Sequence, residues 1–169
     1  MIDAPFDIPE YLAVVPSPIG RLELLSDDDT VTRLVIEDDG SLPHDDLPRR
    51  TNPVLDEAAA QLCEYFDGTR REFTVPVTAT GTAFQRAIWD GLTLVPYGSV
   101  ISYAALGSTA VGTRGGRAVG RAVAANPLPL LIPSHRVVST RGAVTGFSGS
   151  QGPAIKRWLL EHERAEIVV

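Results

Sequence analysis

The chain has 169 residues, enough for one large domain or two small ones, and 44% of them are hydrophobic, which is ample for a buried core. No apolar run approaches the ~18 residues that a membrane span needs, and the acidic, proline-containing N-terminus does not resemble a secretory signal. The single cysteine, Cys63, cannot form an intramolecular disulfide, and three scattered histidines provide no zinc-finger spacing. We therefore expect a globular cytoplasmic protein with no membrane partner, no metal and no cofactor.

The formal net charge of −6 hides a difference between the two halves of the chain. Residues 1–80 hold 17 Asp and Glu against 6 Arg, a balance of −11, whereas residues 81–169 hold 4 acidic and 9 basic residues, a balance of +5. A polyanion is attracted to the second half and repelled by the first. An ordinary acidic surface with a chance asymmetry explains the charges equally well, so composition alone does not decide the partner.

The first half predicts a small α+β domain over residues 1–80. Alternating apolar and polar residues, separated by Pro, Gly and an Asp-rich turn, predict short strands within 11–20, 21–26 and 32–37. Asn52-Pro53 then has the form of a helix cap followed by a first-turn proline, and apolar residues recur at helical spacing until Gly68. Cys63 falls on this apolar stripe, which favours a buried, unreactive thiol. The segment REFTVPV (71–77) predicts a last short strand.

The second half, residues 81–169, changes to helical patterns after the stretch TATGT. Residues 84–95 predict a helix that ends at Pro96-Tyr97-Gly98, and Ser102 caps a second helix over 103–111. After a glycine-rich turn, RAVGRAVAANP (117–127) predicts a third helix, and two short helices joined by such a turn suggest helix-turn-helix. Apart from its arginines this third helix is almost entirely Ala, Gly and Val. It can approach another surface closely, although tight packing inside the protein explains the composition equally well.

The last part of the chain combines an extended segment, a loop and a helix. LPLLIPSHRVV (128–138) predicts an apolar strand that presents Ser134 and His135 near its end. Residues 139–150 predict a turn-rich loop, and residues 154–165 a final amphipathic helix. The apolar residues that we expect to face inward from this helix are Ile155, Trp158 and Leu159.

Four segments of the second half together resemble a known family. They are FQRAIWDGLTLVPYGSVISYAAL (84–106), GRAVGRAVAANPLPLLIPSHRVV (116–138), GAVTGFSG (142–149) and KRWLLEHE (156–163). In order and spacing they are similar to the C-terminal domain of the O6-alkylguanine-DNA alkyltransferases, over about residues 81–163. The first half resembles that family's N-terminal domain only in size and element order. The resemblance implies an α+β fold, with a small ribonuclease H-like α/β domain followed by a helical winged helix-turn-helix DNA-binding domain.

In that family a cysteine thiolate attacks the alkyl carbon on guanine O6, and the protein is consumed by the transfer. Carried over by position, the acceptor cysteine falls on Ser134, its relay partners on His135 and Glu163, and a relay asparagine on Asn126. Neighbouring side chains of a strand point to opposite sides, so we expect His135 to act on residue 134 through a water molecule.

The resemblance also implies how damaged double-stranded DNA is recognised. The alkylated O6 lies inside the duplex, so the nucleotide must be rotated out before it can react. Tyr103 falls on the residue that pushes the 3′ phosphate, and Arg117 on the residue that fills the vacated stack. Small residues such as Ala118 and Gly120 let the helix approach the minor groove, which is only ~6 Å wide.

The resemblance also assigns residues of this chain to the DNA phosphates and to the pocket for the flipped base. Arg114 and Arg121 would meet phosphates. The walls of the base pocket are implied to be Val137, Val138, Phe147, Ser148 and Gly149. Phe147 departs from the family's common tyrosine, and Ser150 from a common glycine, so the fit of the base differs from the family pattern.

A hydroxyl is far less acidic than a thiol, so we expect no useful alkyl transfer to Ser134. The serine is compatible with an engineered Cys-to-Ser form that traps a substrate complex, with a natural alkyltransferase-like protein that flags lesions for a repair partner, or with a changed chemistry. Alkyltransferase-like proteins usually lack a full N-terminal domain and often carry tryptophan at this position. This chain has neither trait.

Two interpretations outside this family stay open. Ser134, His135 and Glu163 are the residue types of a serine hydrolase triad, although no G-x-S-x-G motif surrounds the serine. A winged-helix transcription factor would use residues 117–126 to read the major groove, although Asn126 is the only base-reading side chain besides the arginines.

Overall fold

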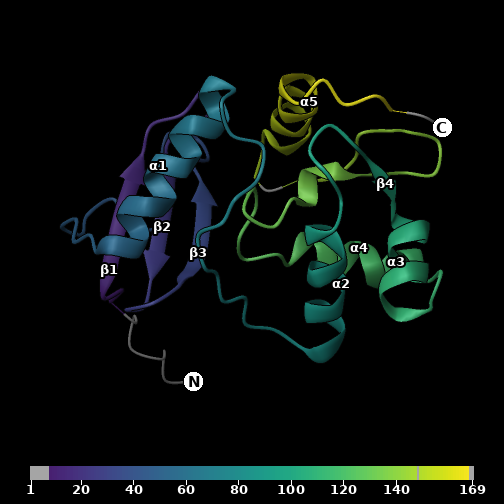
Figure 1. Ribbon diagram of the computed structural model, residues 1–169, viewed down its shortest axis with the longest axis horizontal. Coiled ribbons are helices and arrows are strands. Elements are labelled where there is room, and N and C mark those ends of the chain that lie inside the picture. Colours follow the sequence, from purple (N-terminus) through teal and green to yellow (C-terminus); the bar gives the residue numbers. More distant parts are fainter. Residues whose placement is uncertain (1–7, 148, 168–169) are drawn as a thin grey trace. The chain divides into compact units, whose positions relative to one another are not determined.

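The computed structural model describes residues 8–147 and 149–167, and it divides the chain into two compact units (Figure 1). The first unit takes in the chain up to Glu37 together with Leu42–Thr78. The second takes in Asp38–Ser41 and the chain from Ala79 onward. The division thus falls after Thr78, two residues before the boundary that we predicted, and no local pattern predicted that Asp38–Ser41 groups with the second unit.

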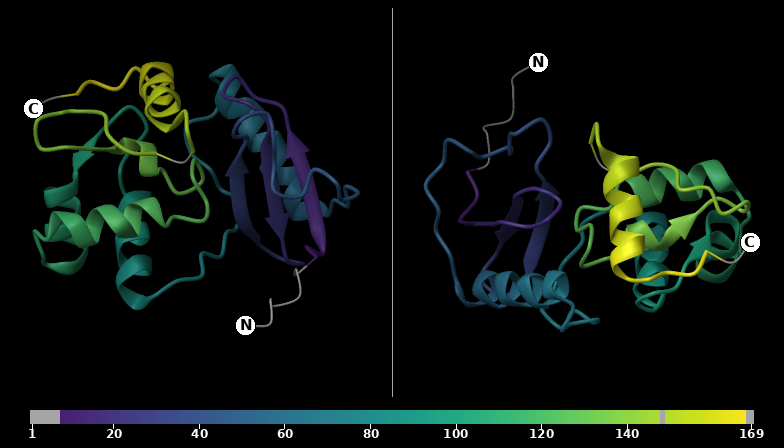
Figure 2. Two further views of the ribbon diagram at one scale, coloured as in Figure 1. Left: turned by 180° about the vertical axis from the view of Figure 1, so that it is seen from behind. Right: turned by 90° about the horizontal axis from the view of Figure 1, so that it is seen from above.

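The first unit is a three-stranded antiparallel sheet with one helix. Its strands β1 (Tyr11–Val15), β2 (Leu22–Ser26) and β3 (Val31–Ile36) lie in the order β1-β2-β3, and the register shifts between Leu25 and Ser26. These strands fall within or beside the segments whose alternation predicted them. Helix α1 (Pro53–Asp67) lies along one face of the sheet, as Figure 2 shows.

Both ends of α1 follow from local sequence. The Asn52 side chain accepts a hydrogen bond from the backbone N–H of Leu55 at 3.0 Å and donates one to the carbonyl of Asp27 at 2.9 Å, so the cap also ties the helix to the loop after β2. Pro53 occupies the first turn, where its missing N–H is harmless. Gly68 ends the helix with a left-handed φ of 87°. The predicted cap, proline and stop are confirmed.

Two predictions for the first unit are wrong. Cys63 is exposed, because the buried stripe of α1 runs through Leu62, and the next residue is turned by about 100° away from it. Residues 71–77 form no strand beyond a single bridge of Val77 with Val31. The Gln61 side-chain oxygen instead accepts from the backbone N–H groups of Thr74 at 2.9 Å and Val75 at 3.2 Å, which takes up donors that a strand would need.

The second unit is mainly helical. It contains α2 (Ala83–Thr93), α3 (Tyr103–Val111), α4 (Gly116–Ala124) and α5 (Gly152–His162), with β4 (Ile101–Ser102) paired in parallel with β5 (Val137–Val138). Thr82 and Gln85 form a reciprocal capping box at the start of α2, and Ser102 caps α3 as predicted. A helix-poor first unit and a helix-rich second unit confirm the α+β class.

Helices α2, α3 and α4 pack on one another around a small apolar core. Trp89 of α2 is buried and donates its indole N–H to the carbonyl of Ala122 in α4 at 2.8 Å, which fixes the two helices together. A Cβ atom at Gly107 of α3 would lie 2.5 Å from the Thr113 carbonyl oxygen and 2.7 Å from Val119, so only glycine allows the α3–α4 turn to close this tightly.

The predicted strand through Ser134 and His135 is wrong. Ser134–Arg136 instead form a short 3₁₀ turn, η1, and only Val137–Val138 are extended. Leu130 has a left-handed φ of 73°, and Pro129 and Pro133 lack the N–H that a ladder needs. The side chains of residues 134 and 135 therefore do not alternate between two faces of a strand as we had expected.

Among the residues that the structure describes, no helix is long and apolar enough to cross a membrane.

Candidate functional site

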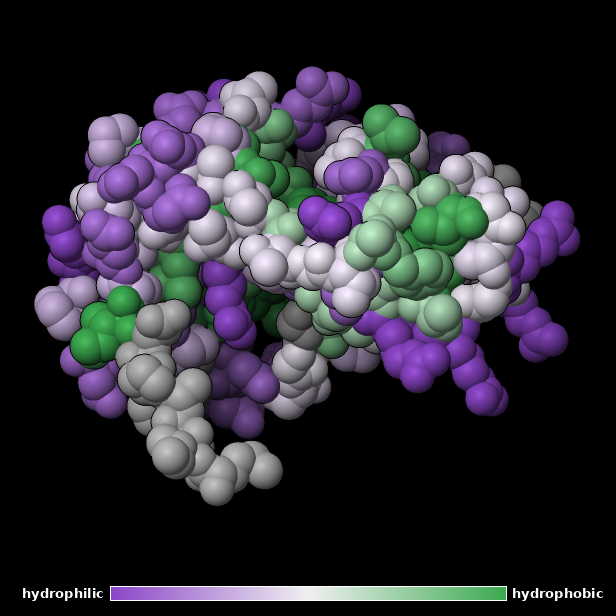
Figure 3. Space-filling model, turned by 90° about the horizontal axis from the view of Figure 1, so that it is seen from below, coloured by the Kyte–Doolittle hydropathy of each residue, from purple (hydrophilic) through white to green (hydrophobic). Residues whose placement is uncertain are grey.

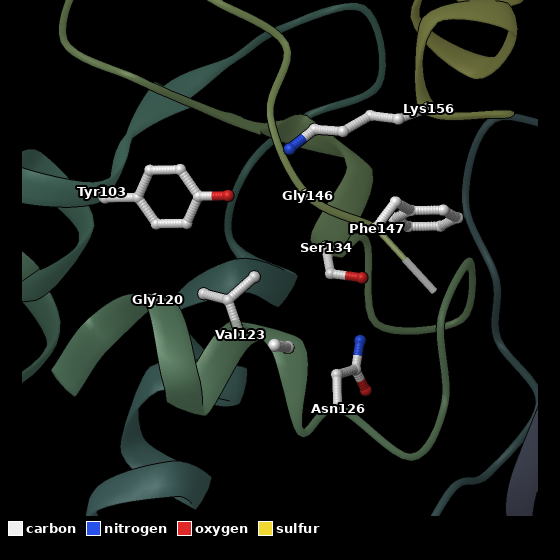
Figure 4. Close-up of a pocket in the computed structure, with 9 residues that line it drawn as sticks. Tyr103, Gly120, Val123, Asn126, Ser134, Gly146, Phe147 and Lys156 are labelled. Carbon is white, nitrogen blue, oxygen red and sulfur yellow. The ribbon is translucent and has the colours of Figure 1, made fainter. Parts of the chain in front are cut away.

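A cavity of about 190 Å³ opens within the second unit (Figure 4). Its lining consists of Tyr103, Gly120, Val123, Ala124, Asn126, Ser134, Gly146, Phe147 and Lys156. These residues come from the start of α3, the second half of α4 and the segment that follows it, the 3₁₀ turn, the loop before α5 and α5 itself. In Figure 4 the Tyr103 side chain enters from the left and the Lys156 side chain from the upper right, with the hydroxyl and the ammonium pointing toward each other, while Ser134 and Asn126 lie below them.

A buried polar cluster adjoins Ser134. His135, Arg136 and Glu163 are almost fully buried. The His135 Nε2 atom lies 2.7 Å from Glu163 Oε1, and Arg136 donates to the same carboxylate through Nε at 3.0 Å and Nη2 at 2.9 Å. The Gly98 N–H also donates to Glu163 Oε2 at 3.2 Å, and Arg136 Nη1 donates to the Val95 carbonyl at 2.8 Å. The cluster therefore joins the end of α2, the 3₁₀ turn and the end of α5.

Electrostatics fix the protonation of this cluster. Burial by itself favours a neutral Glu163, but the hydrogen bonds from His135 and Arg136 outweigh it and hold the Glu163 pKa well below its usual range. Burial lowers the pKa of His135, so its ring is neutral at neutral pH. An ionised carboxylate can only accept, so the proton of the ring is on Nε2 and Nδ1 is an acceptor. No side chain or backbone group of the described chain pairs with this buried Nδ1 atom.

Asn126 shapes the segment that leads to Ser134. Its side-chain amide donates to the Ile132 carbonyl at 2.8 Å, and its side-chain oxygen accepts from the Leu128 N–H at 2.9 Å. Because both ends of the amide are used, Asn126 holds the loop after α4 in one conformation. The residue therefore positions Ser134 on the cavity wall, whatever further contact it makes with a ligand.

Lys156 is the cation of the cavity lining. It is 1% exposed, and its Nζ donates to the Thr145 carbonyl at 2.9 Å and lies 5.7 Å from the centre of the Tyr103 ring. The Tyr103 hydroxyl donates to the same carbonyl at 3.3 Å. Burial lowers the pKa of Lys156 to about 8, and burial likewise raises the pKa of Tyr103. Both groups thus remain largely protonated donors at neutral pH.

The loop before α5 is held at its far end. The Asp38 Oδ1 atom accepts from the Ser150 hydroxyl at 2.6 Å and from its N–H at 3.1 Å, and these hydrogen bonds lower the pKa of Asp38. A Cβ atom at Gly152 would lie 2.4 Å from the Phe147 carbonyl oxygen, so this glycine lets the loop pack against the start of α5. Phe147 reaches the cavity from this anchored loop.

Helix α4 presents arginines and small residues to the surface. Arg117 and Arg121 are exposed, as is Arg114 in the preceding turn, while Val119, Ala122 and Val123 are buried. A Cβ atom at Gly120 would meet nothing within 4 Å. On the face seen in Figure 3, pale, weakly hydrophobic surface gathers over the helices of this unit, and hydrophilic side chains project beside it. Cationic side chains flanking a surface without bulky groups suit a narrow, negatively charged groove.

Two family models together match nearly the whole described chain. Residues 11–79 match the ribonuclease-like domain of 6-O-methylguanine DNA methyltransferase, and residues 83–165 match the DNA-binding domain of the same enzyme. The constitutive methylated-DNA–protein-cysteine methyltransferase of Bacillus subtilis is 36% identical over 158 residues, covering 91% of this chain and 95% of that protein. The chain belongs to the O6-methylguanine DNA methyltransferase family.

Solved structures agree with this assignment. The crystal structure of the Mycobacterium tuberculosis O6-methylguanine methyltransferase matches with a TM-score of 0.82 at 32% identity, covering 91% of this chain and 92% of that one. A structure of the M. tuberculosis protein in complex with DNA matches with a TM-score of 0.81 at 33% identity and the same coverage. The methyltransferase family that the motifs predicted is confirmed.

Within this methyltransferase fold, the predicted site residues fall into three groups. Those on the cavity lining are Tyr103, Gly120, Asn126, Ser134 and Phe147. His135 and Glu163 form the buried pair beside it. The remaining predicted residues do not line the cavity. Val137 and Val138 are buried in β5, Ala118 is half-buried, and Gly149 is exposed. The three arginines of α4 and its preceding turn are also exposed. Ser148 lies outside the described residues.

Three residues of the site, Lys156, Arg136 and Asp38, were not predicted from the sequence. Helical spacing could have found Lys156, because the buried positions Gly152, Lys156, Leu159 and Glu163 recur at intervals of three and four along α5 and just beyond its end. Arg136 follows directly on His135 and was visible as part of the motif. No local pattern points to Asp38, since its partner Ser150 is 112 residues away.

Proposed function

We propose that this protein is a DNA repair protein that recognises O6-alkylguanine in duplex DNA, and that Ser134 makes it a lesion-binding protein without alkyl transfer. The observation that supports this most is the combination of a serine on the cavity wall with a complete His135–Glu163 pair beside it. The relatives named above are methyltransferases that act on methylated DNA through a cysteine. The single cysteine of this chain, Cys63, is exposed on α1 in the first unit and does not line the cavity.

Recognition by nucleotide flipping fits the arrangement of the second unit. The cavity lies between α3, α4 and the loop before α5, and the exposed side of α4 combines arginines with residues no larger than alanine. In our proposal α4 approaches the minor groove, Tyr103 turns the lesion-bearing nucleotide, and Arg117 occupies the space that it leaves in the stack. Arg114 and Arg121 bind the backbone phosphates. The flipped base enters the cavity with its O6 substituent near Ser134.

The serine separates recognition from chemistry. In a transfer reaction the nucleophile attacks the alkyl carbon, the bond from that carbon to O6 breaks, and the guanine leaves with the electron pair while the nucleophile loses its proton. His135 Nδ1, neutral and unpaired within the described chain, is the acceptor for that proton, directly or through water. At neutral pH a neutral imidazole can convert a thiol to its thiolate, whereas a hydroxyl, with its far higher pKa, stays protonated and is a poor nucleophile toward an alkyl carbon. The pocket is therefore expected to bind the lesion and leave it intact.

The experiment measures binding and transfer on the same protein. We expect duplex DNA with one O6-methylguanine to bind roughly tenfold or more tightly than the undamaged duplex, and both affinities to fall as salt rises. Equal affinity for the two duplexes would refute lesion recognition. With radiolabelled methyl on the lesion, the wild-type protein should take up no label, whereas Ser134→Cys should take up one methyl per chain.

Matched variants separate the outcomes of this assay. Ser134→Ala should bind the lesion like the wild type and take up no label, which controls for labelling elsewhere on the chain. Stoichiometric uptake by the wild type would contradict the non-transferring assignment. If Ser134→Cys binds the lesion but remains unlabelled, the pocket itself is unsuited to transfer. A hydrolase predicts turnover of an aryl ester that Ser134→Ala abolishes, and we expect none, since the His135 ring makes no hydrogen bond with the serine.

A further inference from the structure

No carboxylate of the described residues pairs with the buried ammonium of Lys156. Its described hydrogen-bond partner is a neutral backbone carbonyl, that of Thr145 at 2.9 Å. Within the described chain no carboxylate lies within salt-bridge distance of Nζ, and no described lining residue of the cavity is acidic. The carboxylate at the end of the same helix, Glu163, is already shared between Arg136 and His135. The cavity therefore has a net positive character on the side where Lys156 enters.

A buried charge without a partner is unfavourable for folding, since transfer from water is only partly repaid by one hydrogen bond to a neutral group. The lowered pKa of Lys156, about 8, has burial as its cause and no acidic neighbour that opposes it. The other titratable groups close to it, Tyr103 and His135, are both neutral at pH 7. A negatively charged group that entered the cavity would remove this penalty and gain a charge-assisted hydrogen bond.

Burial limits what this negatively charged group can be. Lys156 is 1% exposed, so a phosphate of the DNA backbone cannot reach it from the surface. The ligand must enter the cavity itself, which Lys156 shares with Ser134 and Tyr103. Nζ has three N–H bonds, and the Thr145 carbonyl uses one of them, so two remain for a ligand. A small carboxylate attached to the base that occupies the cavity meets these conditions.

We propose that Lys156 forms a subsite for a carboxylate on the O6 substituent, so that O6-carboxymethylguanine is bound in preference to neutral adducts of the same size. The proposal rests on the function proposed above, because it assumes that an O6-alkylated guanine enters this cavity. It names the class of lesion that the protein selects: adducts with a negatively charged O6 substituent.

The test compares four duplexes of one sequence in fluorescence-anisotropy titrations at fixed salt and pH 7. They carry guanine, O6-methylguanine, O6-carboxymethylguanine, or O6-carbamoylmethylguanine, the neutral amide that matches the carboxymethyl group in size. The wild-type protein should bind the carboxymethyl lesion about tenfold more tightly than the carbamoylmethyl lesion. In Lys156→Met, which keeps the apolar stem and removes the charge, that ratio should fall to about one. Arg157→Met removes a neighbouring exposed cation outside the cavity lining and should leave the ratio unchanged.

The outcomes distinguish the two proposals. If O6-methylguanine binds more tightly than guanine but the carboxymethyl and carbamoylmethyl lesions bind equally, lesion recognition stands and the charged subsite is refuted. If no modified duplex binds more tightly than guanine, the proposed function itself fails. The wild-type ratio does not depend on any variant, so a Lys156→Met protein that failed to fold would leave the test decisive. A ratio that persists in a folded Lys156→Met protein would also overturn the assignment to Lys156.

Discussion

The most direct test of how α4 meets DNA is Gly120→Ala. Gly120 lies in the middle of this helix on the cavity lining, and a Cβ atom there would meet nothing within 4 Å. The added methyl group therefore causes no clash inside the protein. Alanine is favoured over glycine in a helix interior by about 0.5–1 kcal/mol, so the variant should be more stable than the wild type.

The same methyl group should weaken DNA binding, because in our proposal this side of α4 lies against the minor groove. A methyl group forced into a closely packed contact typically costs about 1–3 kcal/mol. By the affinity scale this corresponds to a Kd about 5 to 150 times higher. The prediction is therefore a variant with a higher unfolding temperature and a weaker affinity for DNA, two changes that general damage to the fold cannot produce together.

Thermal unfolding and titration of duplex DNA with the purified variant would measure the two quantities. Gly116→Ala is the matched control, because it lies at the start of the same helix, also has no neighbour within 4 Å, and does not line the cavity. Gly107→Ala is the opposite control and should lower stability, since its Cβ would lie 2.5 Å from the Thr113 carbonyl oxygen. Unchanged DNA affinity in a stabilised Gly120→Ala protein would refute the close approach of α4 to DNA.

Two further predictions follow from the anchors around the cavity. Asp38→Ala removes the acceptor of both Ser150 hydrogen bonds and should weaken lesion binding by about 2- to 10-fold in an anisotropy titration. The control is Asp39→Ala, because the Asp39 carboxylate is 3.4 Å from the same hydroxyl. An equal loss of affinity in Asp39→Ala would contradict a specific role of Asp38. Glu163→Gln leaves the buried Arg136 charge unpaired and should lower the unfolding free energy in urea by about 3–5 kcal/mol. Folding lowers the pKa of Glu163, so the ionised carboxylate contributes fully to the free energy of unfolding above its ordinary pKa of about 4.3, and this contribution is lost as the pH falls below that value. Acidification should therefore destabilise the wild type more than the variant. Equal acid sensitivity of the two proteins would refute this.

Local signals in the sequence predicted most of the elements, because their causes are local. The Asn52 cap, the Gly68 stop and the Ser102 cap each depend on residues within one helical turn, and all three appear in the structure. The prediction failed where a distant side chain supplied the hydrogen bonds. The Gln61 side chain satisfies the backbone of Thr74 and Val75 in place of a strand.

The order of the motifs was enough to predict which residues belong to the candidate site. It was not enough to predict the properties that these residues acquire from burial. Motif register located Ser134, His135 and Glu163, and the structure brings the last two within 2.7 Å of each other. The order and spacing of the motifs could not show that residues 134–136 form a 3₁₀ turn, because that conformation depends on the neighbouring prolines together with the side-chain amide of Asn126. The order of the motifs also did not reveal that Lys156 is buried, although helical spacing along α5 places it on the same stripe as Gly152 and Leu159.

The buried cluster explains why a serine at position 134 is compatible with an intact site. Arg136 and Glu163 bind the Val95 carbonyl and the Gly98 N–H, so they hold the end of α2 against the end of α5 whatever the neighbouring nucleophile is. None of these hydrogen bonds involves the side chain of Ser134. The shape of the cavity and the orientation of its lining therefore do not depend on the acceptor atom, and recognition and transfer are separable properties of this fold. Exchanging that one side chain for cysteine then changes the nucleophile alone, which is why the methyl-uptake assay on Ser134→Cys tests the chemistry of the pocket rather than its assembly.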